Sequence, residues 1–372
     1  MPPLQKNTTL QQRLHTTNNL DGQNSKDQIK KNGYFEQDLV WPNVIVYITL
    51  HYFFILALWR LFTGQMMFAT FLFNLIYLII CIVGVTGGNH RLWSHRTYKA
   101  KLPLRIYLML LQSAAIQNNI YIWARDHRLH HKYTDTEADP HNSNRGFFFS
   151  HVGWLLMRKH PEVKNKGQTI DMSDVLADPV VQFQMKYYLR LAFLLAYILP
   201  AICTMYFFGD TLSNSLLAAV IRHVISYNGT WSVNSAAHLW GWRPYDSSIN
   251  PVENPSVSFI TLGEGWHNYH HTFPWDYKAA ELGNYRLNGT TGFLDLMAYL
   301  GQAYDLKTVS PDMVRKRIAR TGDGSHAYGK LPLENGNTQD HHELNENVVW
   351  GWDDKDMKVE DINDVTIKYK SR

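Results

Sequence analysis

Apolar residues are gathered into four long blocks separated by polar segments. A helix crosses the hydrocarbon core of a bilayer with about 20 mostly apolar residues. Four stretches approach that length: about 43–62, 66–88, 189–208 and 212–233. Only short links separate the first two and the last two, so the pattern predicts two helical hairpins. Pro200 is expected to kink the third helix, and Arg222 and His223 make the fourth less apolar than the others. A shorter run, 102–116, is expected to be buried or interfacial.

The polar segments predict how the chain is oriented. The segment between the hairpins, 89–188, carries 14 Lys and Arg residues, whereas the link FFGDTLSN between the last two helices has none. Under the positive-inside rule, the basic segment and both termini face the cytosol. The pattern therefore predicts an all-α integral membrane protein with four transmembrane helices, in two hairpins, under a cytosolic helical cap. The cap comes from residues 89–188 and 234–330.

Composition divides the chain further. Residues 1–37 are rich in Gln, Asn and Thr and are expected to be a mobile tail, and residues 331–372 are acidic and polar and are expected to be a disordered tail. The membrane domain is then 38–330. The net charge is a mild +4, and no run of Lys and Arg is typical of a nucleic-acid-binding patch. The two cysteines, Cys81 and Cys203, are too few for a disulfide-stabilised secreted fold.

Histidine is concentrated in three short motifs, HRLWSH (90–95), DHRLHH (126–131) and HNYHH (267–271). In the last two motifs the histidines are spaced i, i+3 and i+4, which puts them on one face of a helix. His90 and His95 are five residues apart, about 140° around a regular helix. They can share one target only if the second membrane helix ends or bends between them.

One more histidine has a helical relation to a polar residue. Asn234 and His238 are spaced i, i+4 at the cytosolic end of the fourth block, so both can point the same way. The candidate ligands are then nine histidines: His90, His95, His127, His130, His131, His238, His267, His270 and His271. Two ions with four or five nitrogens each would use all nine, and neutral imidazole suits iron, copper and zinc. Asp126 and Glu264 could orient ligand rings through the second ring nitrogen.

The other histidines are interpreted as ordinary surface or core residues. They are His15, His51, His141, His151, His160, His223, His326, His341 and His342.

With these motifs, the sequence resembles the membrane fatty acyl-CoA desaturases of the stearoyl-CoA Δ9 type over roughly residues 34–326. The resemblance rests on HRLWSHRTYKA (90–100), WARDHRLHHKY (123–133), DPHNSNRGFFFSHVGWLL (139–156), NSAAHLWGWRPYD (234–246), GEGWHNYHHTFPWDY (263–277) and RTGDGSH (320–326). NPVE at 250–253 is similar to the motif of insect Δ9 enzymes that favour stearoyl over palmitoyl chains.

The resemblance implies a site and a location. Two iron ions would bind the nine histidines, Asn234 would reach one iron through water, and no other catalytic residue is expected. Matching positions for contact with CoA are Arg125, Arg158 and Lys159, with Asn118 near the thioester, and matching positions along the acyl tunnel are Trp123, Thr230 and Trp231. Family members lie in the endoplasmic reticulum membrane.

The resemblance also implies an activity and partners. The enzyme would insert a cis Δ9 double bond into stearoyl- or palmitoyl-CoA with O₂, for unsaturated fatty acid biosynthesis. No haem-binding HPGG motif occurs in the chain, so electrons would come from a separate cytochrome b5 and its NADH-cytochrome b5 reductase. The implied partners are thus acyl-CoA, O₂, these two proteins and membrane lipid.

Three alternatives remain open from the sequence. The same motifs suit a desaturase of other regiospecificity, such as a Δ11 pheromone-type enzyme, and a histidine-box hydroxylase. A metal transporter is the non-enzymatic alternative. Transporters place their ligands near the bilayer midplane, whereas these histidines follow the ends of the predicted helices.

Overall fold

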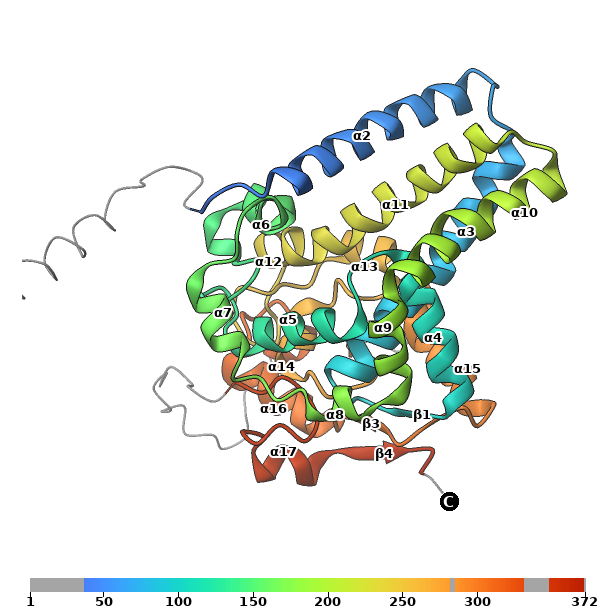
Figure 1. The fold of residues 1–372 in the computed structure, drawn as a ribbon. Helices are drawn as coiled ribbons and strands as arrows, with labels where there is room; N and C mark the ends of the chain where they lie inside the picture. The colour runs from blue at the N-terminus through green and yellow to red at the C-terminus, as the bar shows by residue number, and fades with distance from the viewer. Residues whose placement is uncertain (1–36, 282–284, 331–347, 371–372) are drawn as a thin grey trace, which may run out of the picture.

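The structure is a computed structural model that describes residues 37–281, 285–330 and 348–370. Two long hairpins project from one side of a broader helical body (Figure 1). The first hairpin is α2 (Trp41–Phe62) and α3 (Phe68–Val83), and α3 continues as the π-helix η1 (Gly84–Ser94). The second hairpin is α9 (Pro179–Phe193), the π-helix η4 (Leu194–Ile198) and α10 (Leu199–Phe208), followed by α11 (Leu212–Asn234).

The helical body contains the shorter elements. Between the hairpins these are β1 (Lys99–Ala100), α4 (Leu102–Ala115), α5 (Ile120–Lys132), η2 (Ser143–Arg145), η3 (Phe149–Gly153), α6 (Trp154–Leu156), α7 (Pro161–Gly167) and α8 (Ser173–Ala177). After α11 they are α12 (Ala236–Leu239), α13 (Pro255–Thr261), α14 (His267–Thr272), η5 (Tyr285–Leu287), α15 (Gly289–Tyr299), β2 (Ala303–Tyr304), β3 (Leu306–Thr308), α16 (Pro311–Thr321), η6 (Ala327–Lys330), α17 (Val359–Asp364) and β4 (Thr366–Lys368).

Three of the described helices are long and apolar enough to cross a membrane: Trp41–Phe62, Phe68–Ser94 and Pro179–Phe208. The fourth predicted block forms α11, which has the expected length of 23 residues but a more polar composition. It packs against both α2 and α3, and Arg222 and His223 are buried in it. Polar side chains are tolerated on this helix because they face other helices rather than lipid.

The third apolar helix is longer than the sequence predicted. The expected segment began near residue 189, but α9, η4 and α10 form one continuous helix of 30 residues. The first part, α9, packs against α4 inside the helical body, and α4 is the short apolar run that was expected to be buried or interfacial. The apolar block was therefore only the outer part of a helix that begins in the body.

Pro200 disturbs this helix in a way that explains Arg222. Proline has no N–H, so the carbonyl four residues earlier loses its helical donor, and the π-helical turn η4, which shifts the pairing by one residue, immediately precedes it. The Arg222 guanidinium donates to the Ala196 carbonyl, and the Tyr77 hydroxyl donates to the Leu195 carbonyl at 3.0 Å. Two side chains from neighbouring helices thus satisfy carbonyls at the junction between η4 and Pro200. Arg222 has a structural role here.

The main core of the helical body lies between η1, α4, α5, α9 and α15. Its fully buried members include Leu108, Ile120 and Leu294, together with Val181 of α9. This core fixes η1 against α5, which are the two elements that carry the first two histidine motifs. A second core lies under α16 and includes Tyr245, Tyr269 and Met357.

The expectation of a disordered C-terminal tail is wrong for residues 348–370. This segment contains α17 and β4, and β4 pairs antiparallel with β3 in the register Lys307↔Ile367. Trp350 and Met357 are buried at 4% and 8% exposure. A few well-spaced apolar residues anchor the segment. The sequence did not reveal their role because the composition of the tail as a whole is acidic. The expected mobile segment 1–37 and residues 331–347 lie outside the described residues, apart from position 37.

Two leucines on α15 give a test of the main core. Leu294 is fully buried, whereas Leu296 is 52% exposed on the same helix. Leu294→Ala is expected to destabilise the protein by about 2–5 kcal/mol because it leaves a cavity, and Leu296→Ala is expected to have little effect. Thermal unfolding of the purified proteins in detergent measures both, and equal shifts in Tm would contradict this description of the core.

Candidate metal centre

All nine histidines singled out in the sequence converge in the helical body, in two adjacent groups. The first group is His90, His95, His127, His131 and His270, and the second is His130, His238, His267 and His271. Within each group, one ring nitrogen from each histidine lies within 4.8 Å of those of the others. The elements that supply them, η1, α5, α12 and α14, lie away from the far ends of the hairpins (Figure 1).

The π-helix η1 brings His90 and His95 together. A π-helix bonds each N–H to the carbonyl five residues earlier, and the His95 N–H donates to the His90 carbonyl at 3.1 Å. Residues five apart are therefore one turn apart, and the two ring centroids lie 4.8 Å from each other. The sequence predicted that the helix must end or bend between them. It does end at Ser94, but the change in winding is what aligns the two rings.

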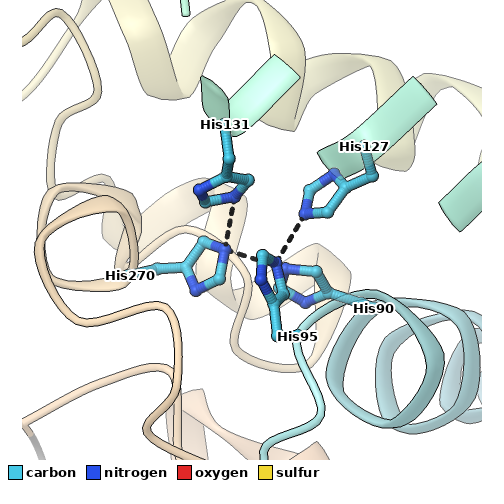
Figure 2. Close-up of side chains that lie close together, drawn as sticks. All are labelled: His90, His95, His127, His131 and His270. Carbon is cyan, nitrogen blue, oxygen red and sulfur yellow. Dashed lines mark hydrogen bonds between the residues drawn. The ribbon is translucent and has the colours of Figure 1, made fainter. Parts of the chain in front are cut away.

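Helices α5 and α14 each supply both groups. From α5, His127 and His131 enter the first group and His130 enters the second. Figure 2 shows His127 and His131 descending from one helix toward His270, His90 and His95. From α14, His270 belongs to the first group, and His267 and His271 belong to the second. The predicted helical faces are correct, and the two groups lie side by side along them.

His238 reaches the second group by a different route from the one predicted. The helix α11 ends at Asn234, and Ser235 breaks it with φ −117° and ψ −72°. Asn234 and His238 are therefore not i, i+4 neighbours on one helix, and that prediction is wrong. His238 lies on α12, with its Nε2 3.1 Å from the Nε2 of His267.

The nitrogen spacings fit bound metal ions. In the first group the Nε2 atoms of His95 and His127 are 2.8 Å apart, and those of His90 and His270 are 2.9 Å apart. In the second group the pairs that join His271 to His130 and to His267 are 3.3 and 3.1 Å. Two nitrogens bound to one ion at about 2.0–2.1 Å, at angles of roughly 90° to 110°, lie about 2.8–3.4 Å apart. The donor set, imidazole without thiolate, suits iron, copper or zinc.

Burial keeps most of these rings neutral. Burial, followed by repulsion from neighbouring imidazoles, holds the pKa well below its usual range for six of them: His95, His127, His131, His267, His270 and His271. A neutral imidazole keeps the lone pair that a metal needs. His130 differs, because burial lowers its pKa but the adjacent Asp139 carboxylate outweighs burial and raises it.

Carboxylates contact the second ring nitrogen of three ligands. Glu264 lies 2.7 Å from Nδ1 of His90, which agrees with the role expected for it. Asp139 lies 2.8 Å from Nδ1 of His130, and Asp135 lies 3.0 Å from Nδ1 of His238. Such contacts fix the tautomer that leaves the Nε2 lone pair available to a metal ion.

The carboxylate that was predicted on α5 to orient a histidine ring does not contact one. Asp126 was expected to orient a ligand ring, but it pairs with Arg125 at 2.8 Å and with Lys159 at 2.5 Å. Asp135 and Asp139, which do contact ligand rings, were missed. They lie in the loop after α5, where spacing gives no orientation. The only available signal was their position directly after the DHRLHH motif.

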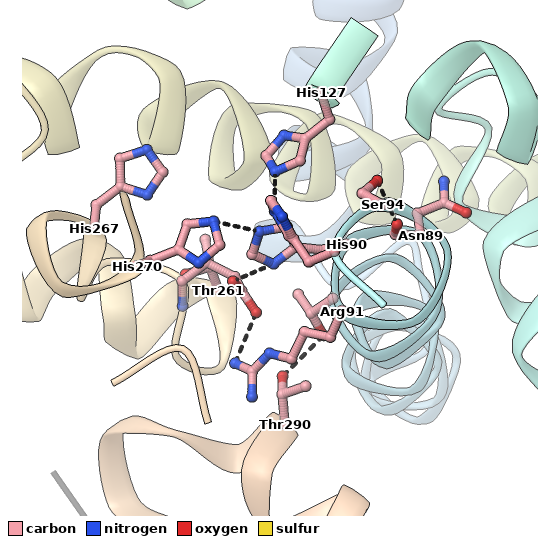
Figure 3. Close-up of polar contacts among 12 residues, drawn as sticks. Asn89, His90, Arg91, Ser94, His127, Thr261, His267, His270 and Thr290 are labelled. Carbon is pink, nitrogen blue, oxygen red and sulfur yellow. Dashed lines mark hydrogen bonds and ion pairs between the residues drawn. The ribbon is translucent and has the colours of Figure 1, made fainter. Parts of the chain in front are cut away.

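Arg91 holds Glu264 in place. It is fully buried, and Figure 3 shows its side chain between His90 and Thr290. One of its nitrogens donates to a Glu264 carboxylate oxygen at 2.9 Å. Its other nitrogen donates to the Tyr277 carbonyl and the Thr291 hydroxyl, both at 2.9 Å. A buried carboxylate needs such a partner to remain ionised, and Arg91 lowers the pKa of Glu264 against the opposing effect of burial.

His141, which the sequence analysis set aside, lies beside the second group. Together with His130 and Asp139 it forms a third set of close donors. Its Nδ1 is 3.5 Å from Asp139, and burial lowers its pKa to about 3. Its position in DPHN, outside any helical spacing with the other motifs, gave no signal for this placement.

A partly open cavity adjoins both groups. His90, His127 and His267 line it, together with Asn234 at the end of α11. Apolar side chains form much of the remaining wall, including Ile82, Val85, Ile225, Val233 and Ile260. The cavity therefore joins apolar surface between α3 and α11 directly to the imidazoles.

Two of the three predicted tunnel residues line this cavity. Trp123 and Thr230 do so, and Gln117, which was not predicted, donates to the Thr230 hydroxyl at 2.9 Å. Trp231 lies outside the lining and packs instead against Tyr47, with ring centroids 5.4 Å apart. The residues of α11 that line the cavity are 225–226, 229–230 and 233–234, which form one face of the helix, and position 231 lies just beyond that face.

The predicted CoA contacts form a basic region near α5. Arg125 and Lys159 meet at Asp126. Arg158 and Lys159 line a small hollow beside α7. Asn118 is exposed in the loop before α5, with φ 67°.

Comparison with known proteins agrees with this geometry. The fatty acid desaturase family model matches residues 66–281. An acyl-CoA Delta-9 desaturase of Acheta domesticus is 51% identical over 346 residues, which cover 93% of this chain and 90% of that protein. The chain belongs to the fatty acid desaturase family. The resemblance inferred from the motifs is thus confirmed, and the desaturase is an oxidoreductase of the kind that acts on acyl-CoA.

Relatives of the desaturase carry names that give different positions for the double bond. An acyl-CoA Delta12-desaturase of Acheta domesticus is 50% identical over 327 residues, covering 88% of this chain and 85% of that protein. Acyl-CoA desaturase 3 of Mus musculus is 52% identical over 294 residues, covering 78% and 81%. Similar identities accompany different double-bond positions, so overall identity does not fix regiospecificity.

The carboxylate at Nδ1 of His130 can be tested by metal affinity. Asp139→Asn is expected to weaken binding of one metal ion roughly 10- to 100-fold, because the ring loses the partner that orients it. Asp126→Asn, on a carboxylate that contacts no ligand ring, is the matched control and is expected to leave affinity unchanged. Metal content after dialysis against graded chelator measures both. Equal losses in the two variants would show that Asp139 has no particular role.

Proposed function

We propose that this desaturase inserts a cis double bond at the Δ9 position of saturated acyl-CoA, with stearoyl- and palmitoyl-CoA as substrates, using O₂ for unsaturated fatty acid biosynthesis. This proposal rests mainly on the cavity, because apolar side chains line one side of it and imidazoles of both groups line the other. An alkyl chain lying in it would reach the metal ligands. The Δ9 position is supported by the Acheta domesticus relative and by NPVE at 250–253.

Two iron ions are the proposed cofactors. The first would be held by the five imidazoles of the first group and the second by the four of the second group, with Asn234 reaching one ion through water. Removal of hydrogen from an unactivated methylene requires an oxidant that no side chain provides, and iron with O₂ supplies it when bound. No side chain beyond the metal ligands is proposed as catalytic.

The chain itself positions the substrate and excludes water. Arg125, Arg158 and Lys159 are proposed to bind CoA phosphates, and Asn118 is proposed to contact the thioester. With the thioester fixed, the distance along the cavity selects which carbons lie near the imidazoles. Trp123 stacks on the His127 ring at 4.8 Å, so it limits the chain's approach on that side. Seven of the nine histidines are buried, which restricts the access of water to the site.

The membrane arrangement is part of the proposal. We propose four transmembrane helices, with α11 as the fourth, in the endoplasmic reticulum membrane, and with the helical body as a cytosolic cap and both termini cytosolic. Support comes from the packing of α11 along α2 and α3 and from the 14 basic residues of 89–188. Cytochrome b5 and its NADH-dependent reductase are the proposed electron donors, and the basic cap would attract an acidic haem protein.

A different regiospecificity is the second candidate. An acyl-CoA Delta(11) desaturase of Spodoptera littoralis is 52% identical over 292 residues, 78% of this chain and 86% of that protein, and the Delta12 relative is 50% identical. A histidine-box hydroxylase would use the same ligands. A metal transporter is disfavoured because α5, α12 and α14, which carry most of the histidines, lie in the helical body, away from the hairpin tips (Figure 1).

Expression in yeast that lacks its own desaturase tests the activity. The wild-type chain is expected to restore growth without added unsaturated fatty acid, and mass spectrometry of the lipids is expected to locate the double bond at Δ9. His131→Ala and His271→Ala, one from each group, are each expected to reduce product to background. His51→Ala, on α2 and outside both groups, is the matched control and should retain activity.

Each other result has a defined meaning. A double bond at Δ11 or Δ12 would replace the proposed regiospecificity, and hydroxylated acyl chains would identify a hydroxylase. Normal turnover in either histidine variant would refute the ligand assignment.

Cysteine labelling in sealed microsomes tests the orientation. Gln65→Cys lies in the exposed link between α2 and α3, and Val359→Cys lies on α17, where Val359 is 70% exposed. A membrane-impermeant maleimide is expected to label position 359 in intact microsomes and position 65 only after detergent is added. Both single-cysteine changes are made after Cys81 and Cys203 are replaced by serine and activity is verified. The reverse labelling pattern would invert the proposed topology.

A further inference from the structure

Residues 348–370, here called the C-terminal strap, run along the side of the helical body opposite the hairpins (Figure 1). The strap begins near the buried Trp350 and ends in β4. Its far end is anchored by the β3–β4 pairing and by Asp364, which accepts from the Ser310 hydroxyl at 2.6 Å. The strap is thus an integral part of the folded structure, and its first residues reach the candidate metal centre.

The strap contacts one of the proposed ligands, His95, directly. Nδ1 of His95 donates to the Trp350 carbonyl, which lies 255 positions later in the chain. The Trp352 N–H donates to the His95 carbonyl at 2.9 Å. Between them, Gly351 lies so close that a Cβ there would be 2.6 Å from the His95 carbonyl oxygen. The strap therefore holds both the ring and the backbone of His95.

The same part of the strap also contacts α5, which carries two other ligands of the first group. The Arg128 guanidinium lies over the Trp350 ring, 3.9 Å from its centroid. Lys132 pairs with Asp354 at 2.8 Å and with Asp356 at 2.7 Å. Arg128 also donates to the Ser94 carbonyl at 2.9 Å. The strap, α5 and the end of η1 are consequently tied together at one place.

We propose that the C-terminal strap is a positioning element for the first group of imidazoles: the Trp350 carbonyl sets the tautomer and direction of the His95 ring, and the strap's contacts with Arg128 and Lys132 hold that ring against the ligands of α5. With its proton on Nδ1, His95 presents the Nε2 lone pair toward the position that His127 also faces, 2.8 Å away. This inference rests on the proposed function, because it assigns the first group to an iron ion.

The inference predicts an effect on one ion rather than two. In the second group, His130 and His238 have Asp139 and Asp135 at Nδ1, so their orientation does not depend on the strap. Loss of the strap contact should therefore weaken the first iron site roughly 10- to 100-fold, which is the usual effect of removing a partner that orients a metal ligand. The second site should be unchanged.

Gly351→Ala is the main test variant, because the added Cβ meets the His95 backbone and pushes the strap away from it. Gly167→Ala is the matched control, because a Cβ there makes an ordinary 3.6 Å contact with the Leu129 side chain of α5. Two further variants act on the strap by other means. Lys132→Met removes the ion pairs to Asp354 and Asp356, and a chain ending at Asn347 lacks the strap entirely.

The experiment measures iron per chain and the rate of iron release to a chelator, on full-length protein purified in detergent. Wild type and Gly167→Ala are expected to hold two ions and release them slowly. Gly351→Ala and the shortened chain are expected to release one ion roughly 10- to 100-fold faster and to keep the other at the wild-type rate. Lys132→Met should change release of the same ion in the same direction.

Three results would overturn the inference or its basis, and they can be told apart. Wild-type protein that is active without iron would refute the proposed cofactor. Two ions released at the wild-type rate from Gly351→Ala would refute the positioning role of the strap. Equal acceleration of both ions would show that the strap stabilises the whole body rather than one site. If the shortened chain fails to fold, Gly351→Ala and Lys132→Met decide the question.

Discussion

The structure depends on packing nine imidazoles next to one another inside the helical body. A ring that points its Nε2 inward is held in that orientation by a partner at Nδ1. Carboxylates provide that partner for His90, His130 and His238, and a carbonyl from the C-terminal strap provides it for His95. The helical body can be understood as the scaffold that brings these partners to the rings, since they come from loops and from the end of the chain.

Two departures from regular helix serve this arrangement. In η1, π winding makes positions five apart neighbours, so one short segment contributes both of its histidines to the same group. In η4, π winding precedes Pro200, and Arg222 and Tyr77 satisfy the carbonyls that lose their donors. The first departure builds the site, and the second keeps a long helix continuous from the body into the hairpin. Both are local changes in hydrogen bonding with consequences across the fold.

Under the proposed function, the cavity would account for differences in product between related chains. Its walls meet imidazoles of both groups at one side, so the position of oxidation would be set by how far an acyl chain reaches along it. Small changes in the wall or in the thioester's anchor would move that position without altering any ligand. Relatives named for Δ9, Δ11 and Δ12 products at about 50% identity are consistent with one centre used at different distances.

The sequence by itself determined the features that depend on local periodicity, which are the apolar blocks and the helical faces of the histidines in 126–131 and 267–271. It also contained the motifs that identify the family. It could not assign each imidazole to one of two groups, because neighbouring rings on one helix face reach both. Nor could it choose Asp135 and Asp139 over Asp126, or foresee that an acidic tail returns to His95. Those outcomes depend on contacts between residues as many as 255 positions apart, and only the folded chain brings such residues together, because their attraction is set by burial and hydrogen bonding rather than by spacing.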